Sequence, residues 1–153
     1  PGDEHLEVFV VHLKSKHDSD GDPNSASWRL AEATAAARIV GEVVREDPAS
    51  LVAIVGDFND TPATPPIQAL LGAGLEDVHA AVPPEQRITY LREPYRSTID
   101  YVFASPALAR RLVPGSAHVL SDPTLLSGSD HAAVYATFDL SRAGAGPRRE
   151  GTP

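Results

Sequence analysis

LVAIVGDFND, residues 51–60, places an apolar run directly before a cluster of polar residues. The first five residues are all apolar, which is typical of a strand that is buried on both faces of a sheet. Gly56 permits a tight turn after the run, and Asp57 and Asn59 follow it. Because α/β folds commonly build their sites at strand ends, the stretch predicts both a central strand and a functional end of the sheet.

The residues before this strand show another strand pattern and a helix pattern. The apolar, β-branched run at residues 6–13 predicts a second buried strand. Residues 28–47 predict a helix that Ser27 caps and Pro48 ends. Apolar residues recur there at steps of three and four, which predicts one apolar face toward the core. That face consists of Trp28, Ala31, Ala35, Ile39 and Val43.

The second half of the chain favours short strands. We expect a short helix at 67–71, a helical turn at 106–112, strands at 88–91, 99–104, 117–120 and 132–140, and a disordered tail or linker at 141–153. No internal repeat or domain boundary is expected before that tail. A long helix between buried strands, followed by a strand-rich half, predicts a layered α/β sandwich.

The composition is that of a folded globular domain. Of the 153 residues, 42% are hydrophobic and 22% are charged, which argues against general disorder. The 13 basic and 21 acidic residues give a net charge of −8, so the chain is not a simple basic coat for nucleic acid. The lack of cysteine excludes a disulfide framework, a thiolate zinc site and a cysteine nucleophile. No apolar run reaches the length of about 18 residues that a membrane span requires.

Asp57 and Asn59 are candidates for metal binding. Residues two apart on an extended segment point the same way, so both side chains can reach one point. A carboxylate and an amide oxygen suit a hard cation such as Mg²⁺. The carboxylate could equally orient or deprotonate a water molecule. The alternative is an Asx-turn, in which both side chains serve only the backbone.

Asp100, Asp130 and His131 are further candidates. Asp100 lies in an otherwise apolar strand, so it must be paired or functional, and a histidine is its simplest partner. Asp130 and His131 precede the final strand, where they could provide a metal ligand and a proton-transfer group. The alternatives are an edge strand with Asp100 facing water, and a capped strand start with a solvated histidine.

The segment HLKSK, residues 12–16, contains both lysines of the chain next to His12, whereas the other 11 basic residues are arginines. In a chain with so few lysines, this pair beside a histidine at a strand end indicates a phosphate-directed role for Lys14 and Lys16. The alternative is a solvated strand terminus.

Four motifs follow one another along the chain: HLKSK at 12–16, GDFND at 56–60, STIDYVF at 97–103 and SDHAAV at 129–134. Together they resemble the endonuclease/exonuclease/phosphatase superfamily, whose fold is that of the DNase I-like nucleases. The resemblance covers residues 6 to about 140, nearly all of the chain. Arg29 and the pair Glu32-Ala33 on the expected helix are similar to the bacterial nuclease-type branch.

The resemblance implies metal-dependent hydrolysis of a phosphate ester by in-line attack of water. Metal and a cationic histidine would stabilise the charge on the phosphate oxygens. The implied cofactor is Mg²⁺, with Mn²⁺ or Ca²⁺ as alternatives, and we expect Lys14, Lys16 and Arg29 to contact substrate phosphate. By position, the resemblance implies that His12 contacts the phosphate, and that Asp57 and Asn59 position water, phosphate and metal. It implies that Asp130 is a metal ligand. His131 would contact or protonate the phosphate, and Asp100 would orient that histidine.

The family domain is longer than this chain, and the resemblance matches its second part. Residues 1–140 are therefore expected to form the C-terminal part of such a domain, with the N-terminal half as a missing partner. That half supplies an asparagine and the glutamate that is the family's principal Mg²⁺ ligand. Without it we expect weak metal binding and an exposed apolar sheet face, unless an upstream segment or a partner covers that face.

Three functions remain open at this point. The first is a metal-dependent nuclease or phosphodiesterase, and the second is a phosphatase acting on a small phosphoester, which the net charge of −8 favours. The third is a non-catalytic binding or assembly fragment. The compartment also stays open: a secreted or periplasmic bacterial protein is compatible with the sequence, and we expect no signal peptide within residues 1–153.

Overall fold

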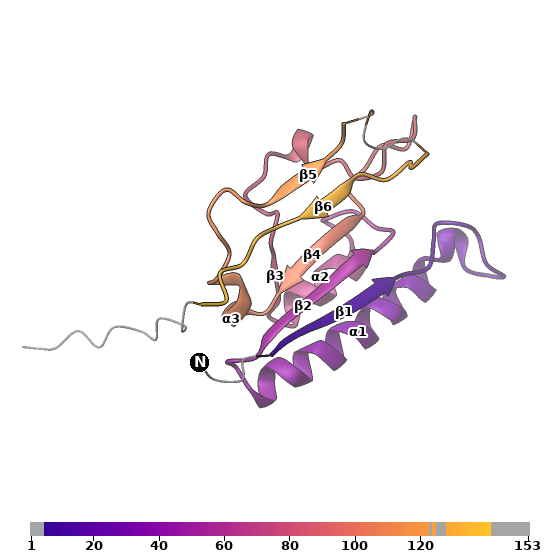
Figure 1. Cartoon of the computed structure of the whole chain (residues 1–153). Coiled ribbons are helices and arrows are strands. Elements are labelled where there is room, and N and C mark those ends of the chain that lie inside the picture. Colours follow the sequence, from indigo (N-terminus) through magenta and orange to yellow (C-terminus); the bar gives the residue numbers. More distant parts are fainter. Residues whose placement is uncertain (1–4, 123, 125–127, 142–153) are drawn as a thin grey trace, which may run out of the picture.

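The computed structural model describes residues 5–122, 124 and 128–141. Strands and helices alternate in the first half of the chain, and strands dominate the second half (Figure 1). In chain order the elements are β1 (Leu6–His12), the 3-10 turn η1 (Pro23–Ser25), α1 (Ala26–Glu46), β2 (Leu51–Asp57), α2 (Pro65–Gly72), β3 (Glu76–Asp77), the 3-10 turn η2 (Pro84–Gln86), β4 (Asp100–Ala104), α3 (Pro106–Ala109), β5 (His118–Leu120) and β6 (Ala133–Tyr135).

The larger sheet has the strand order β1-β2-β4-β3. β1 and β2 are parallel, with α1 as the crossover between them, and β4 is antiparallel to β2. The register pairs His12 with Asp57 across β1 and β2, and Asp57 with Asp100 across β2 and β4. The ends of β1 and β2 therefore meet the start of β4 at one end of the sheet.

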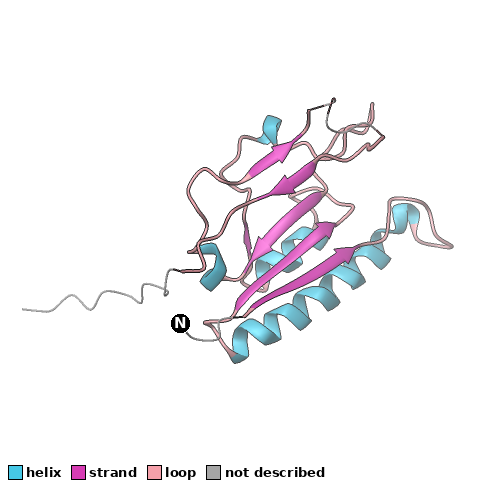
Figure 2. Cartoon of the chain, viewed as in Figure 1, coloured by secondary structure: helices cyan, strands magenta, loops and turns pink. Residues whose placement is uncertain are grey.

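Helices α1 and α2 cover one face of this sheet (Figure 2). Side chains alternate between the two faces of a strand, so Val52 and Ile54 of β2 point toward the helices. Tyr101 and Phe103 of β4 point the same way, and Phe58 packs edge-on against both rings, with centroids 5.6 and 5.2 Å away. This buried layer holds the segment that follows β2 against the sheet.

The opposite face of the larger sheet carries a second layer. Leu51 and Ala53 of β2 and Val102 and Ala104 of β4 are buried there. They pack against α3 and against a two-stranded sheet of β5 and β6, which contributes Val134. The larger sheet thus lies between the two long helices and the small sheet, which is the layered α/β sandwich that the sequence predicts (Figure 1).

β1 is an edge strand, not the buried strand that its apolar sequence predicts. Leu6, Val8 and Val10 lie on the face that the small sheet covers over β2 and β4. Over β1 that cover is missing in the described part of the chain, and the three side chains are 41%, 53% and 77% exposed. The expected exposed apolar sheet face is therefore present, because a two-stranded sheet is too narrow to cover all of a four-stranded one.

The apolar face predicted for α1 is wrong. Trp28 and Ile39 are 59% and 45% exposed, Ala31 and Ala35 are exposed as well, and Val43 packs partly against the core. An alanine-rich helix has apolar residues on several sides, so periodicity alone does not select the side that packs. The close approach of the helix to the sheet selects small side chains instead. The buried residues of the helix are Arg29, Ala33, Ala37 and Val40.

The start of α1 is capped by Asp22, not by the predicted Ser27. Ser25 precedes the helix in a left-handed conformation with φ 47°, and its side chain makes no capping hydrogen bond. The carboxylate of Asp22 accepts hydrogen bonds from the backbone N–H groups of Ser27 and Trp28, each at 3.0 Å. These bonds lower the pKa of Asp22 and satisfy donors that a helix start leaves unpaired.

Two further predictions of secondary structure differ from the structure. Residues 88–91 form isolated bridges around Tyr90 in place of a strand. β6 ends at Tyr135, earlier than the expected end at residue 140. Of the expected tail, residues 142–153 lie outside the described residues. None of the described helices combines the length and the apolarity that crossing a membrane requires.

Gly56 provides a test of the contact between β1 and β2. It has a φ of +137°, and a Cβ atom there would lie 1.9 Å from the carbonyl oxygen of Val11. Gly56→Ala must therefore push the strands apart next to His12 and Asp57, in a backbone conformation that alanine disfavours. We expect the free energy of unfolding, measured by urea denaturation, to fall by at least about 2 kcal/mol.

Gly72→Ala is the matched control for this substitution. Gly72 ends α2, and nothing lies within 4 Å of the atom that alanine would add. The control should change the free energy of unfolding by less than about 1 kcal/mol. Equal stability of the two variants would contradict the close approach of β1 and β2.

Candidate active site

The candidate site lies where β1 and β2 end and β4 begins. Alternation along the strands puts Asp57 on the same face as Val55, and Asp100 on the same face as Val102. Because Asp57 and Asp100 are register partners, both carboxylates leave the sheet on the side of β5 and β6. His12 pairs with Asp57 from β1 and joins them on that side.

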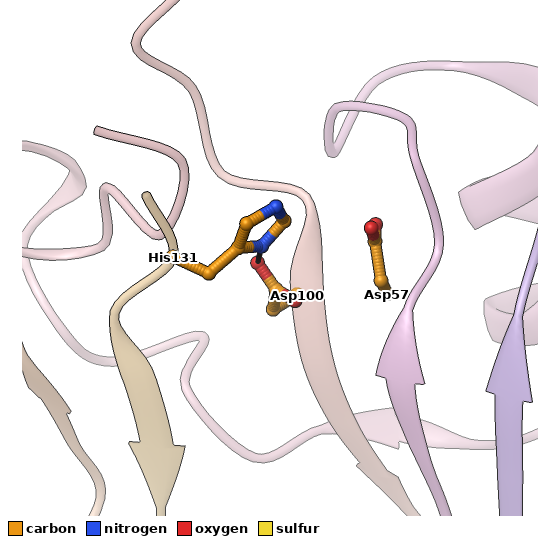
Figure 3. Close-up of side chains that lie close together, drawn as sticks. All are labelled: Asp57, Asp100 and His131. Atoms are coloured by element: carbon orange, nitrogen blue, oxygen red, sulfur yellow. Dashed lines mark hydrogen bonds and ion pairs between the residues drawn. The ribbon is translucent and has the colours of Figure 1, made fainter. Parts of the chain in front are cut away.

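His131 reaches the site from the second sheet. It lies two residues before β6, and its Nδ1 is 2.9 Å from Oδ2 of Asp100. Figure 3 shows the imidazole bonded to Asp100, with its other ring nitrogen turned away from that carboxylate. The side chains of His131 and Asp100 are 32% and 15% exposed. A carboxylate at this distance fixes the orientation of the ring.

The two carboxylate oxygens of Asp57 have different surroundings: one belongs to the turn after β2, and the other faces His12. Oδ1 accepts a hydrogen bond from the N–H of Asn59 at 2.8 Å, which is the bond of an Asx-turn. Oδ2 lies 3.6 Å from Nε2 of His12. Burial raises the pKa of the Asp57 carboxyl, and the charge of Asp100 raises it too, against the opposing effects of Asn59, His131 and His12. The Asx-turn is therefore present without being the sole role of Asp57.

Three of the described side chains are close enough to share a cation. One ligand atom from each of Asp57, Asp100 and His131 lies within 4.8 Å of the other two. The amide of Asn59 lies beside them: its nitrogen donates to the carbonyl oxygen of Leu13 at 2.9 Å and to Oδ2 of Asp57 at 3.2 Å. Its oxygen has no hydrogen-bonding partner in the described part of the chain. Carboxylate and amide oxygens of this kind suit Mg²⁺, Mn²⁺ or Ca²⁺.

Asp130 and the two lysines lie outside this group of three. Asp130 is exposed, and its backbone carbonyl accepts a hydrogen bond from the N–H of Leu91 at 2.8 Å. Lys16 is 45% exposed, and its Nζ lies 3.1 Å from Oδ1 of Asp60. Lys14 is partly buried and is held through its backbone N–H. The metal-ligand role of Asp130 and the phosphate contacts of the lysines stay predictions.

Arg29 does not fit its expected contact with substrate phosphate. Its side chain is 3% exposed, and Nε donates to Oδ2 of Asp60 at 2.8 Å. Nη1 donates to the carbonyl oxygens of Lys14 at 3.1 Å and of Asn24 at 2.9 Å. A guanidinium that is engaged in this way holds protein segments together and is not presented to a ligand.

Two residues that the sequence did not single out complete the site. The hydroxyl oxygen of the buried Thr89 accepts a hydrogen bond from the N–H of Asp100 at 3.0 Å, and its carbonyl oxygen accepts one from Ala132 at 2.7 Å. Tyr90 packs its ring against His131, with centroids 5.2 Å apart. Threonine and tyrosine are ordinary residues in a strand-like stretch, so no sequence signal marks these two.

Several solved structures share this fold. An AP endonuclease from Archaeoglobus fulgidus has a TM-score of 0.71 at 19% identity, over 88% of this chain and 62% of that one. The 3′ phosphatase NExo from Neisseria, bound to a product DNA hairpin, has a TM-score of 0.62 at 25% identity, over 86% and 60%. D. rerio TDP2, in complex with a single-strand DNA product, has a TM-score of 0.57 at 24% identity, over 86% and 55%. This chain thus spans less than two thirds of each.

None of the curated proteins matches the sequence. The profile of the endonuclease/exonuclease/phosphatase family, in contrast, matches residues 8–131. The match begins inside β1, runs through the ends of both parallel strands and the start of β4, and closes on His131. Since this span covers most of the chain and includes every side chain that meets at the end of the sheet, the protein belongs to the endonuclease/exonuclease/phosphatase family.

Proposed function

We propose that this protein hydrolyses phosphoester bonds with the help of a divalent cation, and that its substrate is a nucleic acid. The observation that carries the proposal is the group of Asp57, Asp100 and His131, with ligand atoms within 4.8 Å of one another, in a chain of this family. Hydrolysis by water needs a base for the nucleophile and an acid for the leaving oxygen. Two carboxylates and an imidazole can supply both.

His131 is the proposed acid. Because Nδ1 is bonded to Asp100 at 2.9 Å, Nε2 is left for the substrate. The cationic imidazole would donate a hydrogen bond to a phosphate oxygen, stabilise the charge that builds up there, and give its proton to the leaving oxygen. Asp100 holds the ring in one orientation, and the ring of Tyr90 packs against it, with centroids 5.2 Å apart.

Asp57 is the proposed base. Its carboxylate lies in the group with Asp100 and His131, where it can accept a proton from a water molecule beside the phosphate. It would take a proton from the attacking water, whose oxygen forms the new bond to phosphorus as the bond to the leaving oxygen breaks. His12 lies 3.6 Å from Asp57 and its side chain is 76% exposed, so it is placed to contact the phosphate from the open side.

Asp57 and Asn59 are the residues that would hold the cation, and Asp130, next to His131 in the sequence, is a further candidate ligand. The fit rests on the donors, since carboxylate and amide oxygens are the ligands that hard cations prefer. When bound, the cation would neutralise phosphate charge during an in-line displacement.

Nucleic acid is the proposed substrate class because two of the solved structures with this fold are complexes with DNA products. A second candidate has support of its own. The net charge of −8 favours a substrate with few phosphates, and NExo is a 3′ phosphatase. Removal of a phosphate monoester, from a DNA end or from a small molecule, is therefore the alternative reaction.

Replacing His131 tests the acid. His131→Ala should lower kcat/KM about 10²- to 10⁴-fold, because it removes both the proton donor and the charge that stabilises the phosphate. The rate is measured with Mg²⁺ on a labelled DNA duplex, after circular dichroism has shown that the variant is folded. His118→Ala is the matched control, since His118 is an exposed histidine on β5 of the same small sheet, and the rate should stay at the wild-type value. A wild-type rate for His131→Ala would refute the assignment.

A comparison of two substrates tests the reaction class. We expect the protein to nick plasmid DNA faster than it releases phosphate from p-nitrophenyl phosphate, and EDTA to abolish both reactions until Mg²⁺ is restored. The reverse preference would favour the monoesterase. If the protein supports neither reaction with metal present, the enzyme proposal fails and a binding or assembly role is the better explanation.

A further inference from the structure

A buried ion pair joins α1 to one of the loops at the candidate site. Arg29 is 3% exposed and Asp60 is 5% exposed, and Nε of Arg29 lies 2.8 Å from Oδ2 of Asp60. Both partners of this ion pair are therefore enclosed by the protein.

The same helix holds the loop that follows His12. Nη1 of Arg29 donates to the carbonyl oxygen of Lys14 at 3.1 Å. Glu32, one helical turn further along, accepts a hydrogen bond from the backbone N–H of Lys14 at 2.6 Å. Both backbone polar groups of Lys14, two residues after His12, are thus bound by side chains of α1.

The loop that follows Asp57 is bonded to the loop that follows His12. The N–H of Leu13 donates to the carbonyl oxygen of Asp57 at 2.9 Å, and the side chain of Asn59 donates to the carbonyl oxygen of Leu13 at 2.9 Å. Lys16 reaches across to Asp60 at 3.1 Å. Asp60 is therefore the point at which α1 and both loops are connected.

We propose that Arg29 and Asp60 are positioning residues, whose ion pair sets where His12 lies relative to Asp57. The inference rests on the proposed function, in which His12 contacts the phosphate and Asp57 activates the water that attacks it. Moving two charges from water into the protein costs more free energy than burying two apolar side chains of similar volume. A buried ion pair by itself is therefore weak evidence for a contribution to stability. Its hydrogen bonds, however, define one geometry of the two loops, in which Nε2 of His12 lies 3.6 Å from Oδ2 of Asp57.

The geometry requires arginine at position 29. A planar guanidinium can bond a carboxylate and two carbonyl oxygens at once, whereas a lysine ammonium is a single point at the end of a flexible chain. Arg29→Lys keeps the charge and loses this arrangement, so it separates positioning from charge. Arg38→Lys is the matched control, because Arg38 lies exposed on the same helix and pairs only at the surface with Glu42, at 3.1 Å.

The kinetic test compares these variants in two backgrounds. In the wild-type background, Arg29→Lys should lower kcat about 10- to 100-fold with little change in KM, since misplacement of a reacting group costs rate more than binding. In a His12→Ala background the same substitution should cost little more, because the group that it misplaces is already gone. Equal fold-losses in both backgrounds would overturn the proposal, as would an Arg29→Lys rate equal to that of Arg38→Lys.

A spectroscopic test does not depend on hydrolysis. The imidazole signal of His12 in a ¹H–¹³C spectrum at fixed pH should move in Arg29→Lys and in Asp60→Asn, and should stay in place in Arg38→Lys. An unmoved His12 signal would overturn the proposal even if the protein proves to be an active hydrolase. A moved signal in a protein without activity would uphold the positioning and count against the proposed function. If Arg29→Lys does not fold, Glu32→Gln, which weakens the bond to Lys14, must move the same signal.

Discussion

Asp57 and Asp100 face each other across neighbouring strands, so the sheet must hold two carboxylates side by side. Like charges in such a cross-strand pair are unfavourable, and the raised pKa of Asp57 reflects both the burial and the repulsion. Two imidazoles compensate: His131 lies 2.9 Å from Asp100, and His12 lies 3.6 Å from Asp57. These four side chains meet because β1, β2 and β4 bring His12, Asp57 and Asp100 to one end of the sheet, and the segment before β6 adds His131.

The layers of the fold explain why the site is open. The small sheet of β5 and β6 covers β2 and β4 and brings His131 over the carboxylates, but it does not cover β1. His12 at the end of β1 is therefore exposed to solvent, and Leu6, Val8 and Val10 along the same strand are exposed as well. An apolar edge strand with so little charge is a natural place for further polypeptide to pair.

The errors of the sequence-based predictions have a common cause. The sequence of α1 offers two apolar sides, and packing against the sheet chose the side with Ala33, Ala37 and Val40, which left Trp28 in solvent. That choice buried Arg29, which had been expected to contact substrate phosphate. Thr89 was missed for a related reason: a threonine whose hydroxyl and backbone carbonyl bind two segments of a fold looks like any strand threonine until those segments are placed.

The sequence by itself determined the class of fold, a strand just before Asp57, a strand that contains Asp100, and candidate residues for metal binding and proton transfer, because all of these depend on local patterns. The tertiary structure decided the geometry in which groups meet. It places Asp100 beside His131, the pair that the family resemblance implies, and Arg29 beside Asp60, each across 31 residues of chain. Contacts over such separations depend on strand order, register and helix rotation, and these are settled by the packing of the whole chain and not by any one segment.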